Sequence, residues 1–211
     1  MEWEMFFRNY WKFYLQLEKE FIELTQYIEF VPANYKVYSV KLMQLLLTIG
    51  SEVDSVMKEM CAIKDKDRPS ISDYANVLLV RYPQITAQKV RVFNRSLELT
   101  PFANWDKEKA SQSLFFWETY NKVKHHRAEN FQSASLEAVA NALSALFLLN
   151  MYSFNAIYLE KGNLMHNIPE TADESKLFYL DNWTERIRTS AAKYHYRVYD
   201  DDDHKYILDC P

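Results

Sequence analysis

Large apolar side chains recur along residues 3–28 at steps that alternate between four and three. The positions are Trp3, Phe7, Tyr10, Tyr14, Leu17, Phe21, Leu24 and Ile28. This alternation is the a/d pattern of a heptad, so it predicts an α-helix with one apolar seam. Glu18, Glu20 and Glu23 fall off the seam, on a face that we expect to be solvent-exposed. A helix over residues 3–30 is about 40 Å long and needs a partner helix, in this chain or another.

A second helix is predicted over residues 35–63. Its apolar positions follow helical spacing: Leu42, Leu45, Leu46, Ile49, Val53, Val56, Met57 and Met60. Gly50 lies inside this pattern, where glycine costs about 1 kcal/mol relative to alanine, and we expect it to allow the close approach of another element. The link around Pro32 is short, so the first two helices should be antiparallel.

The middle of the chain has weaker signals. Residues 64–69 are polar and read as a loop, and Ser70 or Ser72 with Asp73 predicts the start of a short helix that Pro83 ends. Residues 88–102 fit either a small hairpin with its turn near Asn94 or an irregular loop over the helices.

Two further helices are predicted in the second half of the chain, over residues 107–130 and 135–161. The later one has an apolar stripe from Leu136 to Tyr158, and Gly162 lies where a C-terminal cap belongs. The fold class we expect is therefore all-α. A bundle of long antiparallel helices forms residues 1–162, with an irregular or hairpin insertion near residues 86–104. A mixed extension, residues 163–211, packs on the bundle and ends in an acidic tail around Asp200–Asp203.

The scarcity of glycine supports this fold class and excludes one kind of site. Two glycines in 211 residues are too few for an all-β fold with many tight turns. They also exclude a glycine-rich phosphate-binding loop of the Walker or dinucleotide type.

Cysteine content and charge limit the cellular compartment and the classes of partner that we expect for this protein. Cys61 and Cys210 are too few for a disulfide framework or a zinc finger, so we expect a reducing compartment, no metal and no cofactor. The acidic start of the chain is unlike a signal peptide, and no run of about 18 apolar residues is evident, so we expect a cytoplasmic protein without a membrane span. The net charge of −4 gives no general attraction to nucleic acid. Residues 81–130, however, carry nine Lys and Arg against five Asp and Glu.

One polar segment within the predicted helix 107–130 carries groups suited to chemistry. Asn121 and His125 are four residues apart and share a face, while Tyr120 and Lys124 share the neighbouring face. Arg127 adds a third basic side chain. An imidazole that titrates near neutral pH could serve acid–base catalysis, and the cations could bind a phosphate. A solvated or interhelical hydrogen-bonding face is the alternative.

The run Tyr120-Asn121-Lys122-Val123-Lys124-His125, followed by an Ala- and Leu-rich helix, resembles the HEPN superfamily of helical-bundle proteins. In that family an arginine, usually followed by a polar residue, precedes a histidine by about five positions. Many members are metal-independent ribonucleases that dimerise so that two motifs meet. The resemblance covers residues 1–162 in the order of helices and about eight residues in motif. It implies Asn121 and His125 as catalytic residues, and Tyr120, Lys124 and Arg127 as binding residues.

The chain departs from the family pattern where Tyr120 occupies the arginine position. The arginine would stabilise charge that develops on a phosphate, and a tyrosine has no permanent positive charge. We therefore expect a non-catalytic HEPN-like interaction or ligand-binding protein that works as a homodimer, with RNA or a nucleotide as a candidate ligand. A metal-independent endoribonuclease of toxin or defence type, using His125, is the alternative. An unrelated regulatory bundle is the third hypothesis. Phe6, Trp11 and Phe13 widen the apolar face of the first helix, and this excess also favours an oligomer.

Overall fold

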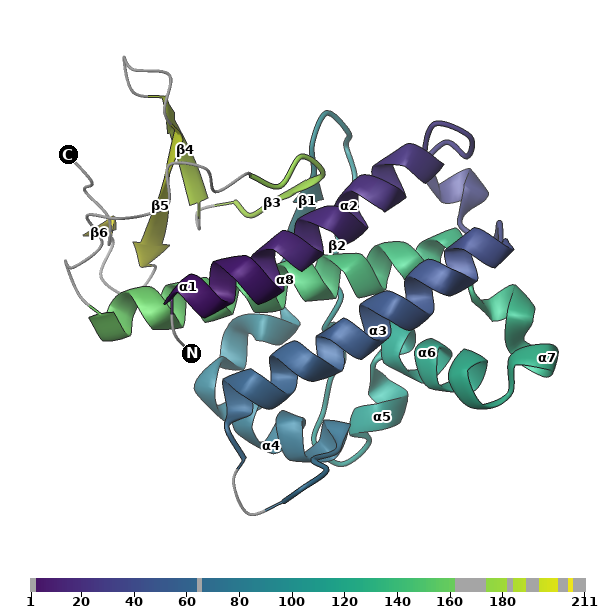
Figure 1. The fold of residues 1–211 in the computed structure, drawn as a ribbon, viewed down its shortest axis with the longest axis horizontal. Coiled ribbons are helices and arrows are strands. Elements are labelled where there is room, and N and C mark those ends of the chain that lie inside the picture. Colours follow the sequence, from purple (N-terminus) through teal and green to yellow (C-terminus); the bar gives the residue numbers. More distant parts are fainter. Residues whose placement is uncertain are drawn as a thin grey trace.

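The computed structural model describes residues 3–63, 66–161, 174–181, 184–188, 194–200 and 205–206. The chain is mostly helical, with a small three-stranded antiparallel sheet against the helices (Figure 1). This mostly helical fold agrees with the expected fold class in part, but the all-α expectation is too narrow because residues of the sheet take part in the core.

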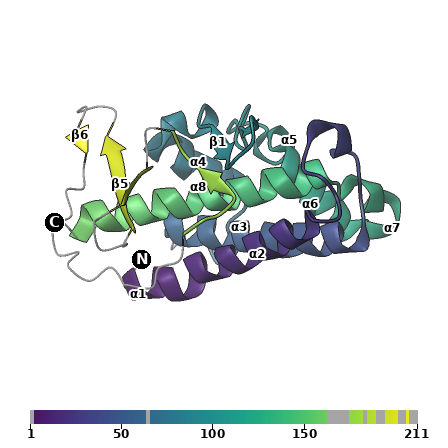
Figure 2. The ribbon, with the colours of Figure 1, turned by 90° about the horizontal axis from the view of Figure 1, so that it is seen from above.

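Helix α8 (Leu136–Lys161) lies along the middle of the bundle. Helices α2 (Lys12–Leu24), α3 (Val40–Cys61) and α6 (Phe115–His125) pack against it (Figures 1 and 2). The predicted apolar stripe is buried from Leu136 to Phe154, but so are Ala138, Ala142 and Ser144 on other faces. A helix enclosed on several sides is apolar all round rather than amphipathic. Its small side chains let neighbouring helices approach closely.

The length and composition of α8 also meet the criteria for a membrane-crossing helix. Within the described residues, Leu136–Ile157 is the one stretch that does so, and 89% of its most apolar window is buried inside the structure. A helix at the centre of a bundle passes the same test, so this finding carries no conclusion about a membrane.

The first helix contains a π-helical segment. The π-helix η1 (Phe6–Trp11) connects α1 (Trp3–Met5) to α2. A π turn closes over five residues rather than four, which places Phe6 and Trp11 on one face. Both are buried, whereas Phe7 and Tyr10, which the heptad seam predicted, are only partly buried against the core. The helical segment ends at Leu24, six residues before the predicted end, and Phe30 turns back to contact Phe21.

Helix α3 begins at Val40 rather than near residue 35. Ser39 caps it, accepting a hydrogen bond from the backbone N–H of Leu42 at 3.1 Å. The preceding segment, which follows the 3-10 turn η2 (Pro32–Asn34), caps the start of α8 instead. The backbone carbonyls of Tyr35 and Val37 accept hydrogen bonds from the first amides of α8. The predicted apolar positions of α3 are all buried.

Helix α4 (Ile71–Arg81) follows the sequence signals closely. Ser70 and Asp73 form a reciprocal capping box at its start, and Pro83 opens the 3-10 turn η3 (Pro83–Thr86) after its end. The predicted short helix is confirmed.

The hairpin alternative for residues 88–102 is also confirmed. Strands β1 (Val90–Val92) and β2 (Glu98–Leu99) are antiparallel, with Val90 opposite Leu99. Asn94 adopts a positive φ of 58° in the turn, a conformation that asparagine tolerates. A third strand, β3 (Phe178–Tyr179), pairs with the other side of β1. The sequence did not predict β3, whose partner lies nearly ninety residues away.

The rest of the described C-terminal extension forms a second antiparallel sheet. Its strands are β4 (Thr184–Arg188), β5 (Tyr194–Asp200) and β6 (Lys205–Tyr206), in that order. The acidic tail from Asp201 to Asp203 lies outside the described residues.

The predicted continuous helix over residues 107–130 is wrong. The structure has three short helices there: α5 (Ala110–Ser113), α6, and α7 (Arg127–Asn130), which leads into the 3-10 turn η4 (Phe131–Ser133). Leu114 has extended backbone angles and is fully buried, and His126 is non-helical. Burial of Leu114 in the core turns the chain between α5 and α6, and no glycine or proline marks either break.

Candidate functional site

Helix α6 carries most of the predicted site residues. One face of it is buried in the bundle through Phe116, Tyr120 and Val123. On the outer face, Lys122 pairs with Glu118 at 2.9 Å, an i,i+4 ion pair that supports the helix. Basic side chains in the last turn also interact favourably with the exposed carbonyls at a helix C-terminus. Basic side chains at the end of α6 therefore stabilise the helix itself.

Tyr120 is a packing residue. Its side chain is only 4% exposed, and its ring meets α3 at Gly50. A Cβ atom added to Gly50 would lie 2.3 Å from Cδ2 of Tyr120, well inside van der Waals contact. The expected close approach at Gly50 is therefore present, and its partner is the residue at the motif's first position.

Lys124 is the predicted site residue that the structure brings to Tyr120. Its Nζ atom lies 5.2 Å from the centre of the Tyr120 ring, a cation–π contact. Lys124 as a residue is exposed, so the ring positions a cation on the outer surface of α6.

Asn121 and His125 share a face without contacting each other. The Asn121 side chain donates from Nδ2 to the carbonyl of Trp117 at 2.9 Å, back along its own helix. His125 is exposed, and its imidazole makes no hydrogen bond or ion pair with any residue that the structure describes. An acid–base histidine is normally oriented by a partner on its second ring nitrogen. The described arrangement presents the imidazole at the surface without such a partner.

Arg127 lies on a different helix from the other four residues. It begins α7, after the break at His126, and is exposed. The structure therefore brings Tyr120 together with Lys124, leaves Asn121 and His125 as neighbours, and places Arg127 beyond a turn.

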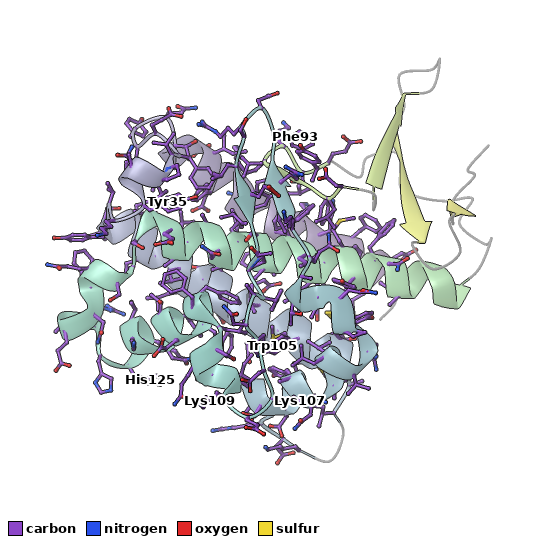
Figure 3. All side chains as sticks on the ribbon, turned by 180° about the vertical axis from the view of Figure 1, so that it is seen from behind. Tyr35, Phe93, Trp105, Lys107, Lys109 and His125 are labelled. Atoms are coloured by element: carbon purple, nitrogen blue, oxygen red, sulfur yellow. The ribbon has the colours of Figure 1, made fainter. Side chains whose placement is uncertain are left out.

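The basic excess of residues 81–130 is not one continuous patch. Arg95 pairs with Glu29, and Arg91 pairs with Asp181 at 2.5 Å, so acids outside that range neutralise part of it. Lys89 pairs with Glu98 at 3.2 Å. Lys107 and Lys109 are exposed and lie along the same edge of the molecule as His125 in Figure 3. Next to these basic side chains, Glu118 on α6 and Glu108 in the sequence supply negative charge.

An apolar surface adjoins the end of α6. Tyr38 contacts Phe131 edge-to-face, with ring centres 5.6 Å apart. Tyr38 is 43% exposed, Val37 is 36% exposed and Val40 is 59% exposed. Turn η4 contacts both α6 and α7, so these residues and Arg127 form one end of the bundle. We call Val37, Tyr38, Val40, Arg127 and Phe131 the end surface.

Other groups with site-forming chemistry give no site in the described part of the chain. No group of three or more His, Cys, Asp or Glu side chains there could hold a metal ion. Cys61 is buried, and burial raises the pKa of its thiol to about 11, so it is not a thiolate nucleophile near neutral pH.

The sequence did not predict the environment of Glu18. The heptad pattern predicted an exposed side chain, and the structure buries it to 2% exposure. Its carboxylate accepts hydrogen bonds from the hydroxyl groups of Tyr14 and Ser175 and from two backbone amides. All but one of these donors come from the C-terminal extension, so no local signal in the first helix could have revealed them.

Comparisons with protein families, curated proteins and solved structures found no match to this chain.

Proposed function

We propose that this protein is a non-catalytic, HEPN-like interaction protein that works as a homodimer. The observation that carries the proposal is the position of Tyr120. It takes the place of the family's arginine, is buried, and packs against Gly50. A buried ring at that position supplies packing between α3 and α6 rather than a charge for a reacting phosphate. His125 is exposed, whereas burial with full hydrogen bonding would favour an unrelated regulatory bundle.

The end surface supports the dimer part of the proposal. Protein interfaces typically combine an apolar, aromatic centre with a polar rim in which arginine is enriched. Val37, Tyr38, Val40 and Phe131 supply such a centre, and Arg127 supplies such a rim. Phe6 and Trp11, which had suggested an oligomer from sequence, are buried within the chain and no longer support one; Phe13 remains 39% exposed.

The catalytic part is tested by incubating the protein with labelled single-stranded RNAs in the presence of a chelator. We expect no cleavage by the wild-type protein. Cleavage that is lost in His125→Ala but kept in His126→Ala, its exposed neighbour, would contradict the proposal and establish the endoribonuclease. Cleavage that survives His125→Ala would refute both the proposal and the assignment of His125.

The dimer part is tested by sedimentation across a range of protein concentrations. We expect a dimer that Val40→Asn weakens by tenfold or more in dissociation constant. The matched control is Val80→Asn, because Val80 is 67% exposed on α4, away from the end surface. A wild-type monomer at all concentrations, or equal weakening by both variants, would contradict the proposal.

A further inference from the structure

The described segment 174–181, which we call the strap, crosses from the C-terminal extension onto the bundle. Its strand β3 pairs with β1, and Phe178 lies against Phe147 of α8 with ring centres 5.7 Å apart. Its Leu177 carbonyl accepts a hydrogen bond from the backbone of Phe93 at 2.8 Å. In Figure 1 the strap runs beside α2 and β1. It therefore joins the small sheet, α8 and the first helix.

One carboxylate fastens the strap to the first helix. Glu18 accepts from Ser175 Oγ at 2.5 Å, from the amide of Lys176 at 2.8 Å and from the amide of Leu177 at 3.3 Å. A fourth donor, the Tyr14 hydroxyl, comes from its own helix at 2.5 Å. Ser175 Oγ in turn accepts from the amide of Phe178 at 3.0 Å, which fixes the turn that leads into β3.

Hydrogen-bond donors, rather than a cation, surround the Glu18 carboxylate in the part of the chain that the structure describes. Among the described residues, no Lys, Arg or His nitrogen lies within ion-pair distance of Glu18. Removing a charge from water is costly unless hydrogen bonds replace its hydration. Two arrangements compensate the carboxylate fully. Either all the strap donors are hydrogen-bonded to it, or the strap is detached and water hydrates it. Partly detached arrangements leave a dehydrated charge with too few donors.

We propose that Glu18 is a clasp that makes the strap a two-state element. The strap is either fully fastened, or it opens as a unit and uncovers the aromatic face formed by Tyr14 and Phe147, while the bundle stays folded. This inference does not depend on the proposed function. Through Glu18, which lies 157 residues before Ser175 in the chain, the first helix thus controls access to the bundle's aromatic face.

Hydrogen exchange of the full-length protein in increasing, non-denaturing urea tests the proposal. We expect the amides of Lys176, Leu177 and Phe178 to exchange through a local opening whose free energy hardly changes with urea concentration. The Leu146 amide in α8 should instead respond steeply, because it exchanges only on global unfolding. The same urea slope for the strap and Leu146 in the wild-type protein would overturn the proposal.

Variants then identify the clasp. Glu18→Gln replaces one acceptor oxygen by a donor facing other donors, and we expect at least tenfold faster exchange of the strap amides with less than a twofold change at Leu146. Ser175→Ala should give a smaller acceleration in the same amides. Glu23→Gln, an exposed carboxyl on the same helix, is the control and should change neither. Equal acceleration of the strap and α8 in Ser175→Ala would show a merely structural role and refute the clasp. If Glu18→Gln does not fold, the wild-type urea dependence and Ser175→Ala decide.

Discussion

At the scale of single residues, two side chains have roles that their sequence neighbours do not reveal. Gly50 is at a crossing of α3 and α6, where the Tyr120 ring occupies the space of a Cβ atom. Glu18 is a charged residue inside the core, because donors from a distant segment replace its water. The helical pattern predicted a close approach at Gly50 but an exposed side chain at Glu18, and in both cases the partner determined what the residue does.

Gly50→Ala should destabilise the protein. Alanine favours the helix by about 1 kcal/mol, but forcing a methyl group into a rigid ring costs about 1–3 kcal/mol. The net loss should appear as a lower urea midpoint, with Ser51→Ala, an exposed neighbour, as the control. The loss should shrink in a Tyr120→Ala background, as a double-mutant cycle would show. An unchanged loss in that background would mean that Tyr120 is not the obstacle.

Glu52 should make stability depend on pH. Burial raises its pKa from 4.5 to about 7, so the folded protein holds this proton more tightly than the unfolded chain. Stability therefore falls as pH rises from about 4.5 to about 7. Glu52→Gln should be more stable than the wild type at pH 8 by about 1 kcal/mol, a value reduced for solvent screening of a half-buried group, and equal to it near pH 4.

Thermal unfolding of both proteins at pH 4, 6 and 8 measures this difference. Glu59→Gln, a carboxyl two turns further along the same helix, is the matched control. A pH profile shared by the wild type and Glu52→Gln would contradict the assignment.

At the scale of elements, helix ends and helix phase decide which side chains meet. The π-helix η1 shifts the buried face of the first helix by one residue relative to a heptad, so Phe6 and Trp11 turn inward. Trp11 then stacks on Tyr14 with ring centres 5.0 Å apart, which places Tyr14 beside the clasp. Caps are more local: Ser39 and the Ser70–Asp73 box begin their helices with side chains close in sequence.

Ser39→Ala should lower stability by about 1 kcal/mol, because it leaves the amide of Leu42 at the start of α3 without its acceptor. Gln44→Ala, an exposed substitution in the next turn, should change stability by less than about 0.5 kcal/mol. Urea denaturation measures the stability of both variants. The slope of the unfolding free energy against urea concentration should stay unchanged. Equal effects of the two variants would mean that the cap contributes nothing.

At the scale of the whole molecule, α8 holds the fold together. It contacts α2, α3 and α6, and its aromatic residues also meet the N-terminal π-helix and the strap. Several elements that are far apart in sequence thus share one core through a single helix.

Leu146→Ala should destabilise the protein by about 2–5 kcal/mol, because Leu146 is fully buried in α8. The control is Val80→Ala, which deletes methyl groups that are exposed on α4. It should lower stability by less than about 0.5 kcal/mol. Guanidinium denaturation midpoints compare them. A loss at Leu146 as small as that at Val80 would show that the interior readjusts around α8 and that α8 is not the centre of the core.

The sequence by itself determined most of the helical framework. Periodicity located α3 and α8 and their buried residues, and caps located α4. It also favoured the hairpin, because strand and turn signals act between near neighbours. Helical spacing likewise placed Asn121 and His125 on one face of α6.

Only the tertiary structure decided where distant segments meet. The third strand, the cap of α8 by residues 35–37, the burial of Glu18 and the break at Leu114 all depend on contacts across the fold. The packing of Tyr120 on Gly50 is of the same kind. Hydrophobic periodicity reports which face of an element is buried, but the partner on that face depends on long-range packing and on which donors arrive there.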